Sequence, residues 1–286
     1  MQHYIKLITT SGGTQSDAWE LLCHATKLSR TELIIKNTAQ LTPVQHQQIT
    51  HAINKYLVHN IPVGYITGSI VFNNLEIQCE PPILIPRPET EEWVAQLITE
   101  IKALANKAPV PLEILDLCTG TGCIGLALAH ALPTVRVTVA DNNPRALALA
   151  QKNIITLGLS HRVTAVLSNI YSTFEGKKFD IIVANPPYIP ENTVLEPSVS
   201  QWEDPQALFA GFHGLDIITP IIQDARKFLT PSIHNNIPCL ILECDITHAE
   251  VVKNLYKQAG FTRVKIQHDL AKKPRSVWGY HMSYTK

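Results

Sequence analysis

Residues 112–129 read LEILDLCTGTGCIGLALA. The first six residues are mostly apolar and predict a buried strand, the next five contain two glycines, and the last seven open a helix. A glycine turn between a first strand and its helix lets a ligand approach the backbone closely. This stretch therefore predicts the start of an α/β sheet with a ligand site where the first strand ends.

The pattern that begins at residue 112 continues to the end of the chain. Strand-like runs alternate with helix-like runs, which predicts a parallel, doubly wound sheet of seven strands. Residues 269–275 are too short for a crossover helix, so we expect the last strand to be antiparallel to its predecessor. The predicted strands are 112–117, 135–140, 162–167, 179–184, 237–243, 262–267 and 276–283, and the predicted helices are 122–132, 144–157, 214–229 and 247–259.

A second informative stretch is VANPPYIP at residues 183–190. It ends a predicted strand, where open α/β sheets place their ligands. Pro186 and Pro187 fix φ and remove two N–H groups, so the loop offers acceptors: the Asn185 side-chain oxygen and the Pro186 carbonyl. These oxygens can accept both N–H bonds of a planar NH2 group while the Tyr188 ring stacks on its face. The loop resembles the signature of methyltransferases that act on exocyclic amines or side-chain amides.

Polar residues also end the first three predicted strands. Asp116 precedes the glycine turn and suits the α-ammonium of methionine better than a phosphate, because the glycine spacing is not GxGxxG. Asp141 ends the second strand, where an acid can accept both hydroxyls of a ribose. Asn169 and Ile170 end the third strand, where we expect them to contact the edge and the face of an adenine.

The residues before 90 have a different pattern. Residues 16–70 predict several short helices, with starts at Ser16-Asp17 and at Thr42-Pro43, and Asn73-Asn74 predicts a hairpin turn. Prolines then delay the next helix until Thr90. We expect three segments: a helical substrate-docking domain at 1–70, a hairpin and proline-rich connector at 71–89, and a methyltransferase domain at 90–286.

Two charged residues lie between prolines in the connector. Arg87 and Glu89 belong to the segment IPRPETE at residues 85–91. Because prolines hold the backbone there, we expect both side chains to face the active-site cleft and to contact the substrate, with helix capping and a surface ion pair as the alternative.

Composition bounds the remaining possibilities. The chain has 286 residues, 45% of them apolar, with 24 basic and 24 acidic residues, and this balance disfavours duplex DNA as the main partner. The six cysteines form no CxxC pair and no zinc-spaced cluster, so we expect free thiols in a reducing compartment, buried at Cys118, Cys239 and Cys244, and no metal. No run of about 18 apolar residues predicts a membrane span. Without a signal peptide, we expect the cytoplasm, with the mitochondrial matrix as an alternative.

Together these motifs resemble the HemK/PrmC family of protein-(glutamine-N5) methyltransferases, which act on peptide chain release factors. The similarity runs over essentially the whole chain. The resemblance rests on the helical N-terminal region and on residues 65–68, 85–91, 116–122, 185–188, 203–208, 214–216, 242–243 and 269–275.

This resemblance implies a class I methyltransferase fold and an enzyme, expected to be monomeric, that uses S-adenosylmethionine without a metal. It implies that residues 185–188 hold the glutamine of the Gly-Gly-Gln motif in a class 1 release factor. It further implies that the cofactor is held by Cys118, Thr119, Gly120, Thr121 and Gly122, by Asp141, by Asn169 and Ile170, and by Asn185, with Asp116 beside the turn.

The chain departs from the family pattern at three places. Cys118 stands where many members have glycine, Asn169 replaces a commoner aspartate, and Cys244-Asp245 stands where a glycine-containing turn usually follows the glutamate of the fifth strand. The last departure leaves the role of Glu243 open.

Two other substrates fit the same chemistry. A ribosomal-protein glutamine methyltransferase shares overlapping motifs, and an adenine-N6 methyltransferase can bind the amine of its substrate with the same loop. Neutral net charge and the lack of a separate basic recognition region disfavour nucleic acid as the substrate. A non-catalytic binding protein with this fold would fail to bind S-adenosylmethionine.

Overall fold

The computed structural model describes residues 1–35, 41–105, 111–231 and 237–282. The chain divides into two compact units, which are taken in turn. The first comprises Met1–Ile70, Cys79–Pro82 and Leu195–Glu203, and the second Val71–Gln78, Ile83–Val194 and Asp204–Lys286. This division groups the hairpin and most of the connector with the second unit. The predicted boundaries, and the docking role of the first domain, stay predictions.

The first unit is helical. Its helix α2 packs against α1, α4 and α5, and together they bury a small apolar core that includes Ile8, Leu21 and Ile49. Helix α1 lies outside the predicted helical range. The helices of this unit are α1 (Gln2–Thr10), α2 (Gln15–Thr26), α3 (Arg30–Ile35), α4 (Pro43–Leu57), α5 (Val63–Thr67) and α9 (Pro197–Ser200).

Capping decides where the two longest helices of this unit begin. Thr42 caps α4 and Pro43 is its first residue, as predicted. The predicted start of α2 at Ser16-Asp17 is wrong by one or two residues, because Thr14 is the cap and Asp17 completes the capping box from inside the helix. The Asp17 carboxylate also accepts a hydrogen bond from the Tyr56 hydroxyl at 2.8 Å, which joins α4 to α2.

The predicted hairpin is confirmed as β1 (Ser69–Phe72) and β2 (Leu75–Gln78). Asn73 and Asn74 both have positive φ, +47° and +63°, which is the backbone that a two-residue hairpin turn requires. The backbone N–H of Asn73 donates to the Glu91 carboxylate at 2.7 Å, and this hydrogen bond joins the turn to helix α6.

Helix α6 (Pro88–Ala105) begins two residues before the predicted start at Thr90. Proline is favoured as the first residue of a helix because its missing N–H would have no partner there. The Arg87 carbonyl accepts from the amides of Thr90 and Glu91. Thr90 therefore lies inside the first turn, and its side chain is free to serve another purpose than capping.

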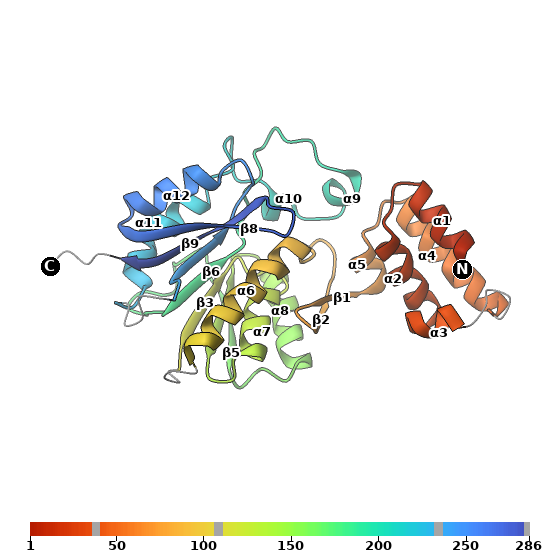
Figure 1. Ribbon diagram of the computed structural model, residues 1–286, viewed down its shortest axis with the longest axis horizontal. Helices are drawn as coiled ribbons and strands as arrows, with labels where there is room; N and C mark the ends of the chain where they lie inside the picture. Colours follow the sequence, from red (N-terminus) through yellow and green to blue (C-terminus); the bar gives the residue numbers. More distant parts are fainter. Residues whose placement is uncertain (36–40, 106–110, 232–236, 283–286) are drawn as a thin grey trace. The chain divides into compact units, whose positions relative to one another are not determined.

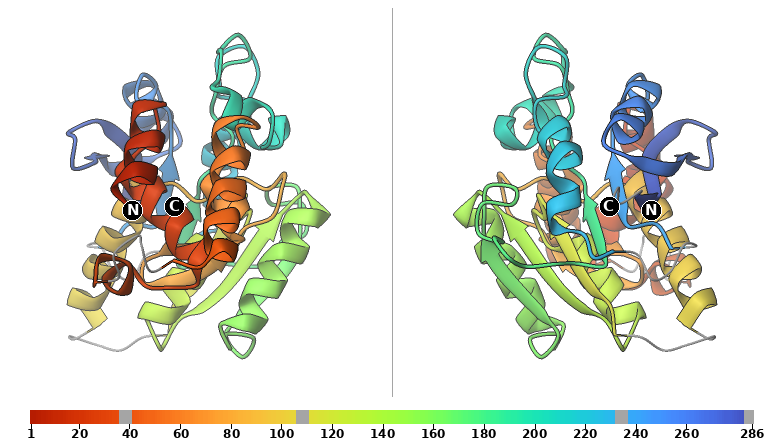
Figure 2. Two further views of the ribbon diagram at one scale, coloured as in Figure 1. Left: turned by 90° about the vertical axis from the view of Figure 1, so that its right-hand side faces the viewer. Right: turned by 90° about the vertical axis from the view of Figure 1, so that its left-hand side faces the viewer.

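The second unit is built on a seven-stranded sheet with the strand order β5-β4-β3-β6-β7-β9-β8 (Figure 1). Its first five strands are parallel and β9 is antiparallel to both β7 and β8, which confirms the predicted fold class and final strand. The strands fan out because each carries a right-handed twist (Figure 2). Their bounds are β3 (Glu113–Leu117), β4 (Arg136–Asp141), β5 (Val163–Leu167), β6 (Ile181–Ala184), β7 (Leu240–Glu243), β8 (Phe261–His268) and β9 (Pro274–Met282).

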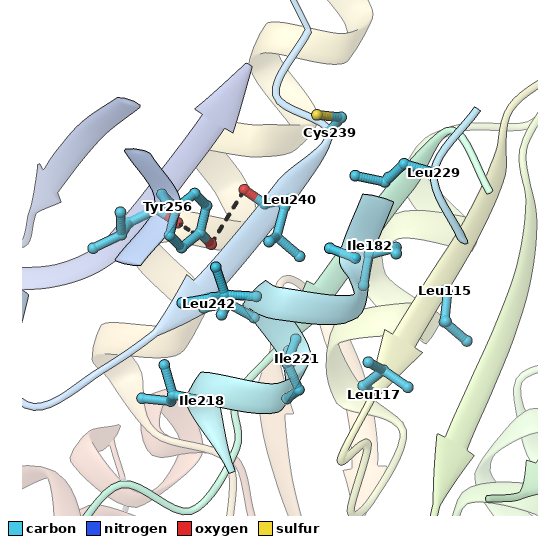
Figure 3. Close-up of a cluster of buried hydrophobic side chains, with 14 of the residues drawn as sticks. Leu115, Leu117, Ile182, Ile218, Ile221, Leu229, Cys239, Leu240, Leu242 and Tyr256 are labelled. Carbon is cyan, nitrogen blue, oxygen red and sulfur yellow. Dashed lines mark hydrogen bonds between the residues drawn. The ribbon is translucent and has the colours of Figure 1, made fainter. Parts of the chain in front are cut away.

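Alternating side chains of the strands give the sheet two buried faces. Leu115, Ile182 and Leu240 pack with α11 and α12 in one apolar cluster (Figure 3). The other face meets α7, where a Cβ added to Gly125 would lie 2.5 Å from Val139. The four predicted helices of this unit are confirmed as α7 (Cys123–Ala131), α8 (Pro144–Thr156), α11 (Ile218–Phe228) and α12 (Ala249–Gln258). The short helix α10 (Pro205–Leu208) was not predicted.

Strand order explains where a ligand can bind. The chain runs outward from β3 through β4 to β5 and then returns to β6 on the other side of β3. Such a reversal opens a crevice at the carboxyl ends of the two central strands. Leu117 pairs with Ala184 in the register, so the glycine turn and the Asn-Pro-Pro-Tyr loop leave the sheet side by side. Within the described residues, no helix is long and apolar enough to cross a membrane.

Candidate active site

The glycine turn between β3 and α7 has an unusual backbone. Cys118, Gly120 and Gly122 have φ values of +54°, +56° and +87°. This region costs a residue with a Cβ about 1–3 kcal/mol, so Cys118 is held there by its surroundings. Cys118 is half-buried rather than buried as predicted, while Cys239 and Cys244 are buried, and all six cysteines are free thiols.

Asp116 holds this turn in shape from beneath. Its Oδ2 accepts from the Thr119 hydroxyl at 2.5 Å and from the Gly125 amide at 2.9 Å. The carboxylate is completely buried, and its Oδ1 has no hydrogen-bond partner among the described residues. Burial raises the pKa of Asp116 to about 7, although the hydrogen bonds from Thr119 and Gly125 lower it.

Asp116 should make stability depend on pH. An acid whose pKa is higher in the folded chain binds its proton more tightly there, so the free energy of unfolding should fall as pH rises from about 4 to about 7. The fall should approach about 4 kcal/mol for a shift of this size. Asp116→Asn should remove this dependence on pH, because the side-chain amide does not titrate. Its oxygen can take the place of Oδ2 as the acceptor. Urea unfolding of both proteins at pH 5 and pH 8 would measure the effect, and equal pH slopes would contradict it.

Asp141 lies at the end of β4 and contacts the turn from the side. Its Oδ2 accepts from the backbone N–H of Gly120 and its Oδ1 from the backbone N–H of Asn143, each at 2.9 Å. Asn143 in turn caps α8. Burial raises the pKa of Asp141, and backbone hydrogen bonds from Asn143 and Gly120 oppose this rise. Each carboxylate oxygen keeps a lone pair for a further donor.

A cavity opens at the carboxyl ends of β3, β4, β5 and β6, with about 1040 Å³ of empty space that includes part of the surrounding solvent. Nine predicted site residues line it: Cys118, Thr119, Gly120, Thr121, Asp141, Asn169, Ile170, Asn185 and Pro187. The Thr121 hydroxyl is buried there without a hydrogen-bond partner among the described residues. The cavity therefore combines acceptors, an unpaired hydroxyl and the apolar side chains Ile83, Ile124 and Ile217.

Other predicted residues do not line this cavity. Asp116 and Gly122 are not among its lining residues, and a Cβ on Gly122 would meet Leu126 at 3.0 Å, so their predicted contacts with the cofactor stay predictions. Arg87 is not among the lining residues, and Glu89 forms an ion pair with Arg275 at 3.6 Å, so the predicted contacts of Arg87 and Glu89 with a substrate stay predictions.

The Asn-Pro-Pro-Tyr loop follows β6 and is fixed at both ends. The Asn185 Nδ2 donates to the Thr90 hydroxyl at 3.3 Å, and the Tyr188 hydroxyl donates to Glu243 at 3.0 Å. Ile189 then forms a parallel bridge with Phe209. Pro186 is buried, and Tyr188 packs against the main apolar cluster. The loop presents Asn185 and Pro187 to the cavity.

Sequence reasoning missed several residues of the site. Asp204 lines the cavity, accepts from the Asn143 side chain at 3.1 Å and caps α10. An aspartate before a proline is a helix-start signal that would have predicted this cap. Thr90 and Glu243 are 153 positions apart, and their hydrogen bond has no local signal.

Comparisons with known proteins agree with this architecture. Residues 2–68 match the PrmC N-terminal domain, and residues 95–201 match the methyltransferase small domain. The chain resembles the release factor glutamine methyltransferase of Salmonella typhimurium, with 34% identity over 96% of this chain and 95% of that one. Identity is 32% to the release factor glutamine methyltransferase of Escherichia coli, over 98% and 96%, and 32% to that of Thermodesulfovibrio yellowstonii, over 89% and 88%.

Solved structures share the fold at low identity. The catalytic domain of human Mettl16 superposes with a TM-score of 0.51 and 15% identity, over 83% of each chain. The Thermus thermophilus 16S rRNA N2 G1207 methyltransferase gives a TM-score of 0.51 and 16% identity, over 74% of this chain and 49% of that one. The sheet and the extent of similarity to the curated relatives lead to one conclusion: the chain belongs to the family of release factor glutamine methyltransferases.

Proposed function

We propose that this protein transfers a methyl group from S-adenosylmethionine to the side-chain nitrogen of a glutamine in a peptide chain release factor. The observation that carries the proposal is the setting of Asn185. Its amide nitrogen is engaged by Thr90, while the residue lines the same cavity as Asp141 and the glycine turn. An amide acceptor in the same cavity as the site for a methyl donor is what transfer to an NH2 group needs.

The cavity fits S-adenosylmethionine by its chemistry. Asp141 can accept ribose hydroxyls with lone pairs that its backbone donors leave open. Ile170 and the apolar residues beside it suit an adenine face, and Asn169 suits its edge. The unpaired Thr121 hydroxyl is a polar group for which a bound ligand would provide a partner. When bound, S-adenosylmethionine supplies an electrophilic methyl group on a sulfonium.

The chain's own residues then have to hold a poor nucleophile. An amide nitrogen shares its lone pair with the carbonyl, so positioning and local electrostatics must do most of the catalysis. We assign the Asn185 Oδ1 and the Pro186 carbonyl to the two N–H bonds of the glutamine. Both oxygens also stabilise positive charge that grows on the nitrogen. Tyr188 packs on the amide plane. The methylated nitrogen must lose one proton, and we assign water as its acceptor, since none of the described side chains is placed as a general base.

The finer assignments rest on the family resemblance. We propose that the target is the glutamine of the Gly-Gly-Gln motif in a class 1 release factor, and that the N-terminal helical unit docks it. Its match to the PrmC N-terminal domain supports that role. We further propose a monomer that acts in the cytoplasm, where translation terminates.

A labelling experiment tests the substrate. Label from S-adenosylmethionine should enter a class 1 release factor, and changing its Gly-Gly-Gln glutamine to alanine should abolish incorporation. Mass spectrometry of the tryptic peptide should find the added methyl on that glutamine. Label on a ribosomal protein or on adenine in nucleic acid, with none on the release factor, would keep the chemistry and reject the substrate.

Gly214 should be essential for the shape of the loop. Its φ is +66°, and a Cβ there would lie 2.2 Å from the Tyr188 carbonyl oxygen. Gly214→Ala should therefore displace Tyr188 and lower kcat/KM about 10- to 100-fold. Gly158→Ala is the matched control, because Gly158 has φ +68° and open space around it. Equal activity of the two variants in the labelling assay would contradict the expected displacement.

A further inference from the structure

Glu243 is a buried carboxylate that the proposed function does not use. It ends β7 and is 0% exposed. Its Oε2 accepts from the Thr90 hydroxyl at 2.7 Å and from the Trp93 indole at 2.8 Å, and its Oε1 accepts from the Tyr188 hydroxyl at 3.0 Å. Burying a carboxylate away from water costs free energy unless hydrogen-bond donors surround it. The three donors here come from α6 and from the Asn-Pro-Pro-Tyr loop.

These contacts set the direction of each hydrogen bond. The Trp93 indole can only donate, so Oε2 acts as an acceptor. Burial raises the pKa of Glu243, and the hydrogen bonds from Trp93, Thr90 and Tyr188 lower it. Because Oε2 accepts from the indole, it has no proton to give, which commits the single proton of the Thr90 hydroxyl to Oε2. Thr90 Oγ1 then offers only lone pairs to its other neighbour, the Asn185 side chain at 3.3 Å.

The commitment of Thr90 decides which way the Asn185 amide faces. The oxygen and nitrogen of an asparagine amide have nearly the same shape, so packing alone selects between the two orientations only weakly. Facing a pure acceptor, Asn185 must turn its nitrogen toward Thr90. Its Oδ1 is thereby directed away from Thr90, on the side of the amide that is left for a ligand.

We propose that Glu243 and Thr90 are positioning residues that lock the Asn185 amide with its oxygen toward the substrate, an inference that rests on the proposed function of Asn185. In the opposite orientation the Asn185 NH2 would face the NH2 of the glutamine, and two donors cannot bond each other. The relay therefore selects the catalytic orientation without touching the substrate.

The second arm of the same carboxylate holds Tyr188. Its hydroxyl is bound to Oε1, which anchors the ring that we have assigned to the amide plane of the glutamine. Burial, together with the Glu243 carboxylate, raises the pKa of Tyr188 well above its usual range, so the hydroxyl stays protonated as a donor. One buried acid thus supports both side chains that are assigned to the amide.

Thr90→Val is the informative variant. It removes the hydroxyl with little change in shape, whereas Thr90→Ser keeps it. We expect Thr90→Val to lower kcat about 10- to 100-fold, with the KM for the release factor and the Kd for S-adenosylmethionine within about threefold. Thr90→Ser should restore most of the loss. Thr99→Val is the control, since it makes the same change on α6, where the Thr99 hydroxyl donates to the Ala95 carbonyl and contacts none of the residues assigned to the substrate amide.

A second readout does not depend on turnover. The side-chain amide of Asn185, labelled with 15N and identified by its absence in Asn185→Ala, should shift in Thr90→Val and Thr90→Ala but not in Thr99→Val. If wild type labels no release factor, the proposed function fails, while this signal still decides the relay. If Thr90→Val does not fold, Thr90→Ala replaces it in both measurements. A folded hydroxyl-free variant with unchanged kcat and an unchanged Asn185 signal would overturn the inference.

Discussion

Asn185→Ala should abolish methyl transfer and leave cofactor binding measurable. The substitution removes the acceptor oxygen that aims the glutamine nitrogen and stabilises its growing charge, and the loss of one such preorganised group costs about 10²- to 10³-fold in kcat. The variant should still bind S-adenosylmethionine within about tenfold, because Asp141 and the glycine turn remain. Labelled transfer to a release factor measures the first effect, and calorimetry measures the second.

Two further variants sharpen this test. Asn185→Asp keeps an oxygen toward the cavity but places a second oxygen against Thr90, whose proton is bound to Glu243, so it should also lose most of its activity. Asn254→Ala replaces an exposed asparagine on α12 and should behave as wild type. Unchanged turnover in Asn185→Ala would reject its assignment as the amide acceptor.

Asp141→Asn should weaken cofactor binding by about 30- to 300-fold. Both carboxylate oxygens already accept backbone amides, from Gly120 and Asn143. An asparagine has only one acceptor oxygen, so its NH2 must face one of these N–H groups. Losing a hydrogen bond to a charged group costs about 1.5–3 kcal/mol, and the displaced turn adds to the loss. Calorimetric titration with S-adenosylmethionine would measure the change in Kd.

A second hydrogen-bonded acid, half-buried and outside the cavity lining, separates effects on binding from effects on stability. Asp180 accepts from the Glu113 amide and the Thr230 hydroxyl, beside the other end of β6. Asp180→Asn should lower the free energy of unfolding without changing the Kd. If Asp141→Asn binds the cofactor as wild type does, the ribose assignment of Asp141 is wrong.

Local signals in the sequence were enough for most of the fold. Hydrophobic runs predicted all seven strands, and Asn73-Asn74 predicted the hairpin because few residues tolerate two consecutive positive φ angles. Helix starts were less predictable. Pro88 begins α6 two residues early, since a proline that forbids a helix interior is favoured in its first turn.

Motifs also predicted most of the candidate site. The glycine turn, Asp141 and Asn185 lie around one cavity because each follows a parallel strand, and parallel strands end at one edge of a sheet. Asp116 has a second part that its place before the turn did not predict. Its Oδ2 is bound by the Thr119 hydroxyl and the Gly125 backbone N–H within the turn, while its predicted contact with the α-ammonium of the cofactor stays a prediction.

The sequence by itself determined which functional groups follow the strands along the chain. These are a glycine turn, an acid and an acceptor loop, each at the end of a predicted strand. Only the tertiary structure decided which way the Asn185 amide faces. That choice depends on Thr90 and Glu243, which come from a helix and a strand far apart in the chain. A hydrogen-bond direction is a property of the whole network, because each proton can be donated only once, and no local pattern encodes it.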